Sequence, residues 1–376
     1  MLLTEHNVFY YLLDKGMTST AAVVNGTFSA RRSDSRNNNF IINREFDEGA
    51  YFIKQVKAPD AEKVETLRAE AACYQLASTD KRFAVLKRSL PEFHYFDARN
   101  HILIVEQIRE MISLHDHYFS FYNFQNDIPQ KLAAILAAYH VTNMLQEPAK
   151  EQDAATTPLP FRKQKPWVFT IATQPPEAWM HGPPSAETQT MQMIFKHPEY
   201  VQLLAQCEHD WQPYSLVHND IKFANFLVNT GDQNNSIGEI KLVDWELADI
   251  GDPLWDVAGI FLAYLQLWIT TDLPEQELRM YPHIKKIGLP QVQPCMDQFW
   301  KEYSTRSGYD AATAWLMLEK TVKFTALRLI HACFESAPYS TSLQPGGAKM
   351  LQVSFNILRS PAGAATQLLG IKPAFV

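Results

Sequence analysis

The stretches LVHNDIKFANFLVN (residues 216–229) and IKLVDWELADIGDPLWDVA (residues 240–258) decide the fold of this chain. Branched and aromatic residues dominate positions 226–228 and 240–243, which we predict to be β-strands. The polar run between them is rich in glycine, asparagine and aspartate, which is typical of a turn. We therefore predict a hairpin that brings the loop before its first strand close to the end of its second strand.

Polar side chains gather at both ends of this hairpin. His218, Asp220, Lys222 and Asn225 precede the first strand, and Asp244 follows the second. Carboxylate and amide oxygens that lie side by side are ligands that suit Mg²⁺. Asp220 is then left free to meet a substrate hydroxyl. The stretch therefore predicts the arrangement that phosphoryl transfer needs.

The bulk properties of the chain indicate its class. At 376 residues one compact core is not expected, so we predict two lobes. A net charge of −7 gives no reason to expect nucleic acid, whose recognition needs a basic face. The four cysteines are far apart and form no metal motif, which indicates free thiols. The longest apolar run, residues 257–270, is shorter than the roughly 20 residues that span a bilayer. We expect a cytoplasmic protein with neither a membrane nor a nucleic acid as partner.

The two parts of the chain differ in pattern. Before residue 108 we predict a helix at 6–17, strands at 21–29, 39–46 and 50–56, a helix at 61–77, and strands at 93–96 and 102–106. After it we predict helices at 129–145, 188–207, 255–268, 295–303 and 311–336, with a mixed tail from 337. Residues 146–184 are rich in proline, glutamine and alanine, and are predicted as a lid or substrate-binding insertion.

The motif spacing carries a family resemblance. His218, Asp220 and Asn225 stand in the spacing H-x-D-x-x-x-x-N, and Asp244-Trp-Glu takes the place of the D-F-G motif. In these motifs the chain resembles the aminoglycoside phosphotransferase and choline kinase family, most clearly over residues 50–260. The resemblance implies an α+β, bilobal, protein-kinase-like fold. Residues 1–108 would form a small, β-rich, nucleotide-binding lobe, and residues 109–376 a larger, mainly helical, catalytic and acceptor-binding lobe.

The resemblance also implies roles for the residues of the hairpin. Asp220 would accept or orient the acceptor hydroxyl, while Asn225 and Asp244 would hold Mg²⁺ between the phosphates. His218 would order the loop by hydrogen bonding. Lys222 would either touch the γ-phosphate or be a solvated loop lysine.

Two further acids follow the hairpin. Glu246 stands where D-F-G has glycine, and it would support the metal through water or be a surface carboxylate. Asp256 looks like the buried aspartate that braces the backbone of the catalytic loop in this family.

The first lobe supplies residues for the nucleotide. Lys54 ends a strand that resembles V-A-I-K, so it would meet the α- and β-phosphates. Glu70 would be the ion-pair partner that holds Lys54 in place, and Glu65 is an alternative partner on the same predicted helix. The backbone from Glu106 to Ile108, at the join of the lobes, would bind the adenine edge.

The phosphate loop departs from the protein-kinase pattern. Residues 33–39 contain no glycine, although G-x-G-x-x-G would let backbone N–H groups approach the phosphates. We expect Ser35, Asn37 and Asn38 to donate to phosphate oxygens and Arg36 to add charge. The alternative interpretation is an exposed hairpin turn.

Together these residues predict an ATP- and Mg²⁺-dependent phosphotransferase that moves the γ-phosphate to a hydroxyl of a small molecule. A second hypothesis is a kinase for Ser or Thr of a peptide, in natural-product (RiPP-type) maturation beside a partner lyase. The insertion at 146–184 would then help to form a peptide groove. A third hypothesis is a non-catalytic pseudokinase scaffold. The identity of the acceptor, and ATP or GTP as donor, stay open at this point.

Overall fold

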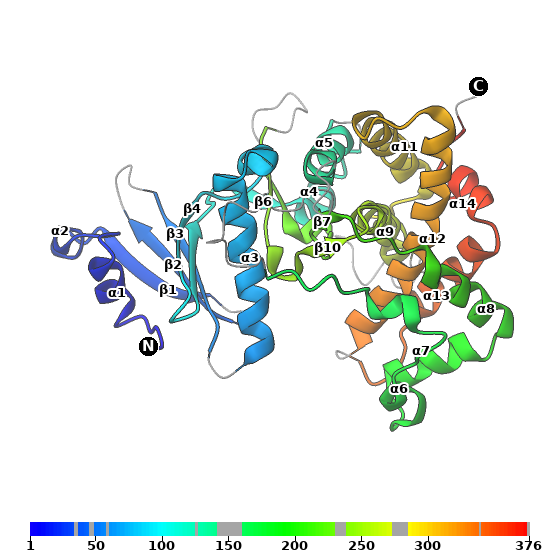
Figure 1. Cartoon of the computed structure of the whole chain (residues 1–376), viewed down its shortest axis with the longest axis horizontal. Helices are drawn as coiled ribbons and strands as arrows, with labels where there is room; N and C mark the ends of the chain where they lie inside the picture. The colour runs from blue at the N-terminus through cyan, green and yellow to red at the C-terminus, as the bar shows by residue number, and fades with distance from the viewer. Residues whose placement is uncertain are drawn as a thin grey trace, which may run out of the picture.

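The computed structural model has two lobes of unequal size (Figure 1). It describes residues 1–33, 37–44, 49–57, 60–124, 127–140, 160–229, 238–272, 285–337 and 340–373. The small lobe holds a five-stranded antiparallel sheet, and the large lobe is mainly helical. This confirms the predicted α+β, bilobal class.

The sheet of the small lobe alternates its side chains between two faces. Its strands run in the order β1 (Phe28–Ser33), β2 (Asn38–Arg44), β3 (Tyr51–Gln55), β5 (Ile102–Glu106) and β4 (Phe93–Asp97). Phe40, Ile42 and Ile53 belong to a buried cluster with Val8 and Leu12 of α1 (Val8–Asp14). Because successive side chains of a strand point to opposite faces, the residues between them face the other side, toward the large lobe.

One predicted strand of this lobe is wrong. Residues 21–29 were expected to be extended because of their branched residues, but the structure forms α2 (Thr20–Val24) and starts β1 only at Phe28. The hydroxyl of Ser19 accepts a hydrogen bond from the Ala22 N–H, which caps the helix start. Gly26 then turns the chain with a positive φ of 69°. Local capping therefore outweighs β-propensity here.

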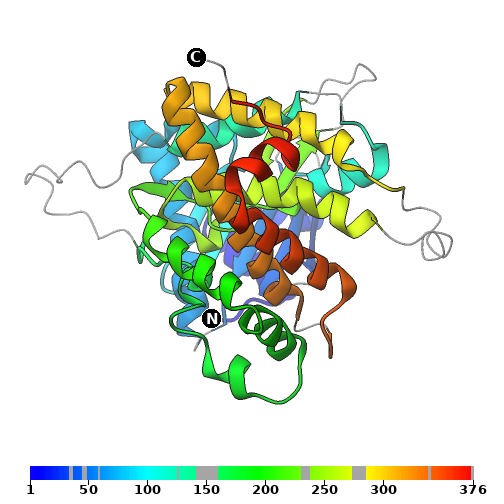
Figure 2. The ribbon, with the colours of Figure 1, turned by 90° about the vertical axis from the view of Figure 1, so that its right-hand side faces the viewer.

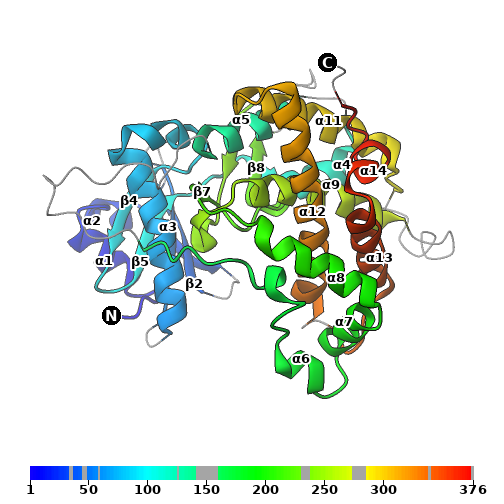
Figure 3. The same ribbon diagram turned by 45° about the vertical axis from the view of Figure 1, so that its right-hand side comes forward.

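Helix α3 (Ala61–Thr79) lies between the sheet and the large lobe (Figures 1 and 3). Good helix formers dominate its sequence, and Asp60 caps its start by accepting from the Lys63 N–H. Its buried residues include Leu67, Glu70 and Tyr74. The predicted helix at 61–77 is confirmed with an end two residues later.

The hairpin that was predicted from the sequence forms in the large lobe. Strands β8 (Phe226–Asn229) and β9 (Ile240–Leu242) pair antiparallel, and β6 (Met111–Ser113) joins β8. A second small sheet pairs β7 (Ser215–Val217) with β10 (Asp249–Gly251). The pairing of β7 with β10 brings residue 218 close to the segment after β9, as the prediction required. Strands β6, β7 and β10, of three residues each, were not predicted.

The core of the large lobe is α9 (Leu254–Thr271), which the other helices surround (Figure 2). Its neighbours include α11 (Leu289–Arg306), α12 (Ala311–Ser336) and α13 (Pro345–Arg359). Helix α5 (Ile128–His140) contacts it through the hydrogen bond of Tyr139 with Asp256. Within the described residues α9 is the helix that is long and apolar enough to cross a membrane, but 83% of it is buried inside the protein. It therefore has the composition of a core helix.

Proline residues set helix starts that differ from the predicted helices of the large lobe. The single helix expected at 188–207 is two, α7 (Ala186–Phe195) and α8 (Pro198–Cys207), because Pro198 begins a new helix. The tail is helical, with α13 and α14 (Pro361–Gln367) each starting at a proline. Two short helices, α4 (Leu114–Phe121) and α6 (Glu177–His181), were not predicted. Residues 141–159, with part of the predicted insertion, lie outside the described residues.

Candidate active site

The loop at residues 218–225 joins β7 to β8, and Asp256 of α9 holds its backbone. The fully buried carboxylate of Asp256 accepts the N–H of His218 at 2.7 Å and that of Asn219 at 2.9 Å. It also accepts the Tyr139 hydroxyl at 3.0 Å and lies 3.2 Å from His140 Nε2. Hydrogen bonds and these partners hold the pKa of Asp256 below its usual value despite burial, so it stays ionised.

His218 ties this loop to the end of β9. Its Nε2 lies 3.0 Å from the Val243 carbonyl, which can only accept, so Nε2 carries the proton. Its Nδ1 then accepts the Asp220 N–H at 3.3 Å. Burial lowers the pKa of His218, which keeps the ring neutral at physiological pH. The side chain therefore has both nitrogens engaged in ordering the loop.

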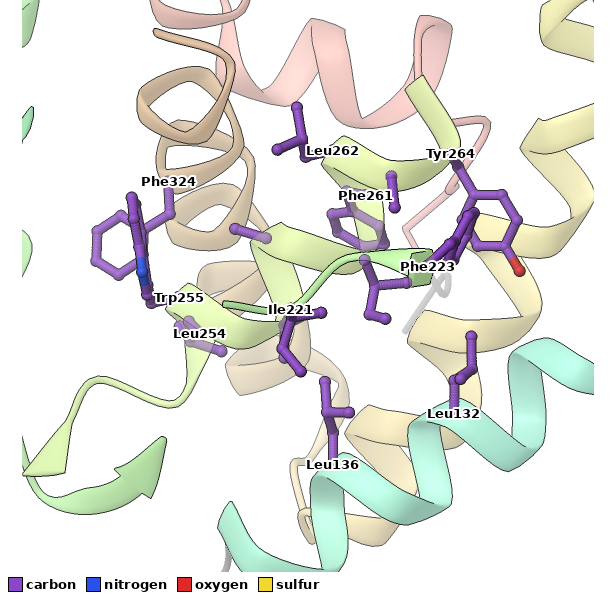
Figure 4. Close-up of a cluster of buried hydrophobic side chains, with 14 of the residues drawn as sticks. Leu132, Leu136, Ile221, Phe223, Leu254, Trp255, Phe261, Leu262, Tyr264 and Phe324 are labelled. Carbon is purple, nitrogen blue, oxygen red and sulfur yellow. The ribbon is translucent and has the colours of Figure 1, made fainter. Parts of the chain in front are cut away.

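Apolar side chains anchor the same loop from below (Figure 4). Ile221 and Phe223 are buried, and they lie beside Leu132 and Leu136 of α5 and beside residues of α9. Asp220 directly precedes Ile221 in the chain, and its N–H donates to His218 Nδ1. The loop is thus held on one side by packing and on the other by hydrogen bonds.

Asp220 and Asn225 come together at the mouth of the loop. Asn225 Nδ2 donates to the Asp220 carbonyl at 2.8 Å and to its Oδ2 at 3.0 Å. Lys222 Nζ contacts the same Oδ2 at 2.7 Å, and its side chain is 47% exposed. Because the Asn225 amide nitrogen is used in this way, its oxygen remains available to a ligand.

Lys54 connects the two lobes. Its Nζ lies 2.9 Å from Glu70 Oε2 and 2.7 Å from Asp244 Oδ1. Burial opposes the charge of Lys54, but the two carboxylates overcome this and raise its pKa. Glu65, the alternative partner, instead forms an ion pair with Arg162. The structure therefore pairs Lys54 with Glu70.

The left-handed backbone marks two positions of this site. Asn219 has a φ of 66° and Asp244 a φ of 68°, values that residues other than glycine adopt rarely. Backbone of this kind persists only where the surroundings hold it, and it is frequent at active sites. At Asn219 the side-chain nitrogen donates to the Leu247 carbonyl at 3.0 Å, which links the loop to the segment after Asp244.

A cavity of about 350 Å³ lies between the lobes, on the face of the sheet that turns toward the large lobe. It gathers six of the predicted nucleotide and metal residues from both lobes: Lys54, Glu70, Glu106, Ile108, Asn225 and Asp244. Its lining residues are Asn39, Ile41, Phe52, Lys54, Glu70, Tyr74, Pro91, Val105, Glu106, Gln107, Ile108, Asn225, Leu227, Val243 and Asp244. We refer to it as the nucleotide cavity.

The predicted contact of Asn38 with phosphate is wrong. Its Nδ2 donates to the Leu3 carbonyl and to Gln55 Oε1, both at 3.0 Å, on the side of the sheet away from the nucleotide cavity. Asn37 directly precedes β2 and is not among the residues that line the cavity. Ser35 and Arg36 lie outside the described residues, so their contacts stay a prediction.

The neighbouring Asn39 was missed. It stands opposite Lys54 in the β2–β3 pairing, lines the nucleotide cavity and is 5% exposed. Its Oδ1 is buried and has no hydrogen-bond partner. The signal that reveals it is the strand alternation, because a residue paired directly with Lys54 must share its face.

A second cavity of about 320 Å³ lies on the other side of Asp244. Its walls come from α3, from the segment at 160–167, from the segment after Asp244 and from α12. Its lining residues are Glu65, Thr66, Ala69, Pro160, Arg162, Gln164, Lys165, Pro166, Trp167, Asn219, Glu246, Leu247, Ala248, Asp249, Trp255, Arg328 and His331. We refer to it as the acceptor cavity.

Two features shape the acceptor cavity. Asp249 accepts the backbone N–H groups of Lys163 and Gln164 at 2.7 and 2.8 Å. These bonds fix the segment 160–167, which lines the cavity and runs beside α3 (Figure 3). Burial and the nearby Asp244 raise the pKa of Glu246, which also lines this cavity. Trp167, Arg328 and His331 were not predicted as site residues, because they belong to segments without a motif and far from residue 220.

His331 gives a prediction about acid sensitivity. Burial, helped by Arg328, lowers the pKa of His331 from 6.5 to about 4. Between these values the unfolded chain binds a proton that the folded chain does not, so the free energy of unfolding falls as the pH falls. We expect His331→Gln to reduce this loss by up to about 3 kcal/mol. Denaturant titrations at a series of pH values measure it, with the exposed His209→Gln as control. A pH dependence equal to that of the wild type would contradict the prediction.

The comparisons with known proteins agree with this geometry. The model of the phosphotransferase enzyme family matches residues 27–295. Since the match covers more than half of the chain, the protein belongs to this family of phosphotransferases, as the motifs predicted. No curated protein matches the sequence.

Several solved structures resemble the chain at low sequence identity. An ethanolamine kinase of Plasmodium vivax has a TM-score of 0.56 and 14% identity, over 93% of this chain and 88% of that one. A microcompartment-associated aminopropanol kinase has a TM-score of 0.48 and 14% identity, over 96% and 100%. The aminoglycoside phosphotransferase APH(4)-Ia, in a complex with ADP and hygromycin B, has 0.49 and 16%, over 95% and 99%. The first of these likenesses supports the kinase-like fold.

Proposed function

We propose that this phosphotransferase moves the γ-phosphate of ATP to a hydroxyl group of a small molecule, with Asp220 as the base. One observation carries the proposal. Lys54, Glu70 and Asp244 meet in the nucleotide cavity that Asn225 also lines, and Asn225 in turn bonds Asp220. Groups for the phosphates, the metal and the acceptor hydroxyl are therefore contiguous.

The nucleotide cavity offers groups for both the phosphates and the adenine of ATP. Lys54 supplies the positive charge for the α- and β-phosphates, and Glu70 holds that charge in place. Ile41, Phe52 and Leu227 supply apolar walls near Glu106 and Ile108, where the backbone would meet the adenine edge. Ile41 and Phe52 are paired across β2 and β3. They lie two positions along their strands from the Asn39–Lys54 pair, on the side nearer to the join of the lobes.

The residues present fit a magnesium ion. Asp244 and Asn225 both line the nucleotide cavity, and they offer a carboxylate and an amide oxygen. Mg²⁺ prefers a few protein oxygens of this kind and takes its other ligands from water and phosphates. When bound, it would neutralise the charge on the phosphates. Lys54 keeps the pKa of Asp244 below its usual value, so the carboxylate is available in its charged form.

The surroundings of Asp220 support a role on the acceptor side. Its neighbour Asn219 lines the acceptor cavity, and its own carboxylate is oriented by Asn225 and Lys222. A carboxylate held in this way orients a hydroxyl toward the γ-phosphate and takes its proton during transfer. Proximity and charge neutralisation supply most of the rate in such reactions.

A turnover assay tests the proposed function. The protein is incubated with Mg·ATP and a panel of hydroxyl compounds (amino alcohols, sugars, polyols and Ser- or Thr-containing peptides), and phosphate transfer is followed by ³¹P NMR. The Asp220→Asn variant is the blank. We expect at least one small molecule to be phosphorylated, while the peptides are not. A wild type that binds no Mg·ATP would rule out the proposal. Transfer to peptides alone would favour the peptide-kinase hypothesis, and binding without transfer the pseudokinase.

Asn39 gives a prediction for the nucleotide side. Because its amide faces the cavity opposite Lys54, we propose that it hydrogen-bonds the ribose or phosphate part of ATP. Removal of one such bond costs about 1 to 1.5 kcal/mol, so Asn39→Ala should weaken Mg·ADP binding by roughly tenfold. Titration calorimetry measures this, with Asn43→Ala as the control, because Asn43 is a partly buried residue of β2 that does not line the nucleotide cavity. Equal affinities for Asn39→Ala and the wild type would remove Asn39 from the site.

A further inference from the structure

Arg328 of α12 reaches the catalytic loop from the far end of the sequence. The residue is 3% exposed, and its Nη1 donates to the Asn219 carbonyl at 3.1 Å. Its Nη2 donates to the Ile221 carbonyl at 3.3 Å. These two carbonyls belong to the residues on either side of Asp220, so one planar group spans the residue proposed as the base.

Helix α9 leaves room for this contact. The Arg328 guanidinium lies 4.6 Å from the centre of the Trp255 ring, on which it stacks. One turn later, Gly259 has no side chain, and an added Cβ would lie 2.8 Å from the Ile221 carbonyl oxygen and 2.9 Å from Arg328 Nη2. A side chain at position 259 would therefore push the loop and the guanidinium apart.

The charge of Arg328 has no stabilising ion pair to explain it. Among the residues that the structure describes, no carboxylate forms an ion pair with it, and its Nε has no hydrogen-bond partner. Burial lowers the pKa of its guanidinium, although the carboxylates of Asp220, Glu335 and Asp256 act in the opposite direction. Packing alone would be better served by an apolar side chain of similar length. The two loop carbonyls supply the acceptors that the buried guanidinium needs.

We propose that Arg328 is a positioning residue that sets the place of Asp220 for the transfer step. The inference rests on the proposed role of Asp220 as base. Asp256 accepts the N–H groups of His218 and Asn219, while Arg328 donates to the carbonyls of Asn219 and Ile221. Asp256 thereby holds the peptide units 217–218 and 218–219, and Arg328 holds the units 219–220 and 221–222, so the backbone is held both before and after Asp220. A misplacement of about 1 Å in such a group costs about a hundredfold in rate.

Two substitutions separate positioning from packing. Arg328→Met keeps the aliphatic stem beside Trp255 but removes both donors, and Arg328→Lys keeps the charge but cannot bridge two carbonyls. Lys323→Met is the matched control, since Lys323 lies on the same helix and pairs with Asp210 at 3.1 Å, away from the loop. The readouts are kcat and KM for Mg·ATP with the acceptor that the panel identifies, and amide hydrogen exchange of residues 218–221 in the free protein.

We expect Arg328→Met to lower kcat by about a hundredfold, with KM for Mg·ATP unchanged within about twofold. Arg328→Lys should recover part of the loss, and Lys323→Met should behave as the wild type. Exchange of the His218 and Asn219 amides should accelerate at least about tenfold in Arg328→Met, corresponding to a loss of about 1.4 kcal/mol.

Three results would overturn the proposal: an unchanged kcat, a parallel change of kcat and KM, or an equal acceleration of exchange throughout the large lobe. If Arg328→Met does not fold, Arg328→Lys decides by the same readouts. If no compound of the panel is phosphorylated, the proposed function is wrong, but this result does not decide the role of Arg328. The exchange rates of residues 218–221 then still show whether Arg328 holds the loop.

Discussion

Asp220→Asn is expected to abolish most of the turnover while nucleotide binding persists. The substitution keeps the size of the side chain, and its oxygen can still accept from Lys222, which now contacts Asp220 at 2.7 Å. An amide takes no proton from the acceptor hydroxyl, and the loss of a general base costs about 10² to 10⁴ in rate. Because Asp220 is not among the residues that line the nucleotide cavity, the affinity for Mg·ADP should change little.

The measurement is kcat with the acceptor found in the panel, together with the dissociation constant of Mg·ADP. Asp297→Asn is a matched control, because Asp297 pairs with Lys301 on α11, one turn away on the same helix. A kcat reduced less than about tenfold would show that another group accepts the proton. A large loss of nucleotide affinity would instead place Asp220 on the phosphate side.

Asp256→Asn is expected to have the largest effect on stability. Its carboxylate accepts from two backbone N–H groups and the Tyr139 hydroxyl, in a site with no exposure to water. An amide nitrogen in place of one oxygen would face donors instead of accepting from them. Breaking a buried charged network of this kind costs about 3 to 5 kcal/mol, a large share of the stability of an ordinary protein.

Urea unfolding of the two proteins measures this difference. The control is Asp272→Asn at the other end of α9, where the carboxylate pairs with Lys286 and Lys349 at the surface. Surface ion pairs contribute about 0 to 1 kcal/mol, so this variant should remain close to the wild type. Similar losses for Asp256→Asn and Asp272→Asn would show that Asp256 does not brace the loop.

The motif residues were predictable because their chemistry fixes their spacing. The positions of Asp220 and Asn225 in one loop, and of Asp244 after the next strand, require a hairpin, and β8 and β9 form it. Long helices such as α12 were equally predictable, since its bounds follow from an uninterrupted run of good helix formers after the capping residue Asp310. In these segments local propensity and tertiary packing agree.

The remaining site residues depend on contacts that a local pattern does not contain. The sequence pointed to Asn38, whereas the residue that lines the cavity is Asn39, one position later. A difference of one position along a strand turns the side chain to the opposite face. Only the pairing with Lys54 decides between the two asparagines. Arg328 lies in a helix whose sequence looks like ordinary core, and its role depends on the packing of α12 against α9.

Helix α3 contributes side chains to both cavities, so a movement of this helix would change the two of them together. One side of the helix holds Glu70 against Lys54, and another places Glu65, Thr66 and Ala69 in the wall of the acceptor cavity. A nucleotide that draws α3 toward Lys54 also reshapes the wall that the acceptor meets. Such coupling is reciprocal, so an acceptor bound more tightly in the presence of nucleotide must strengthen nucleotide binding by the same factor.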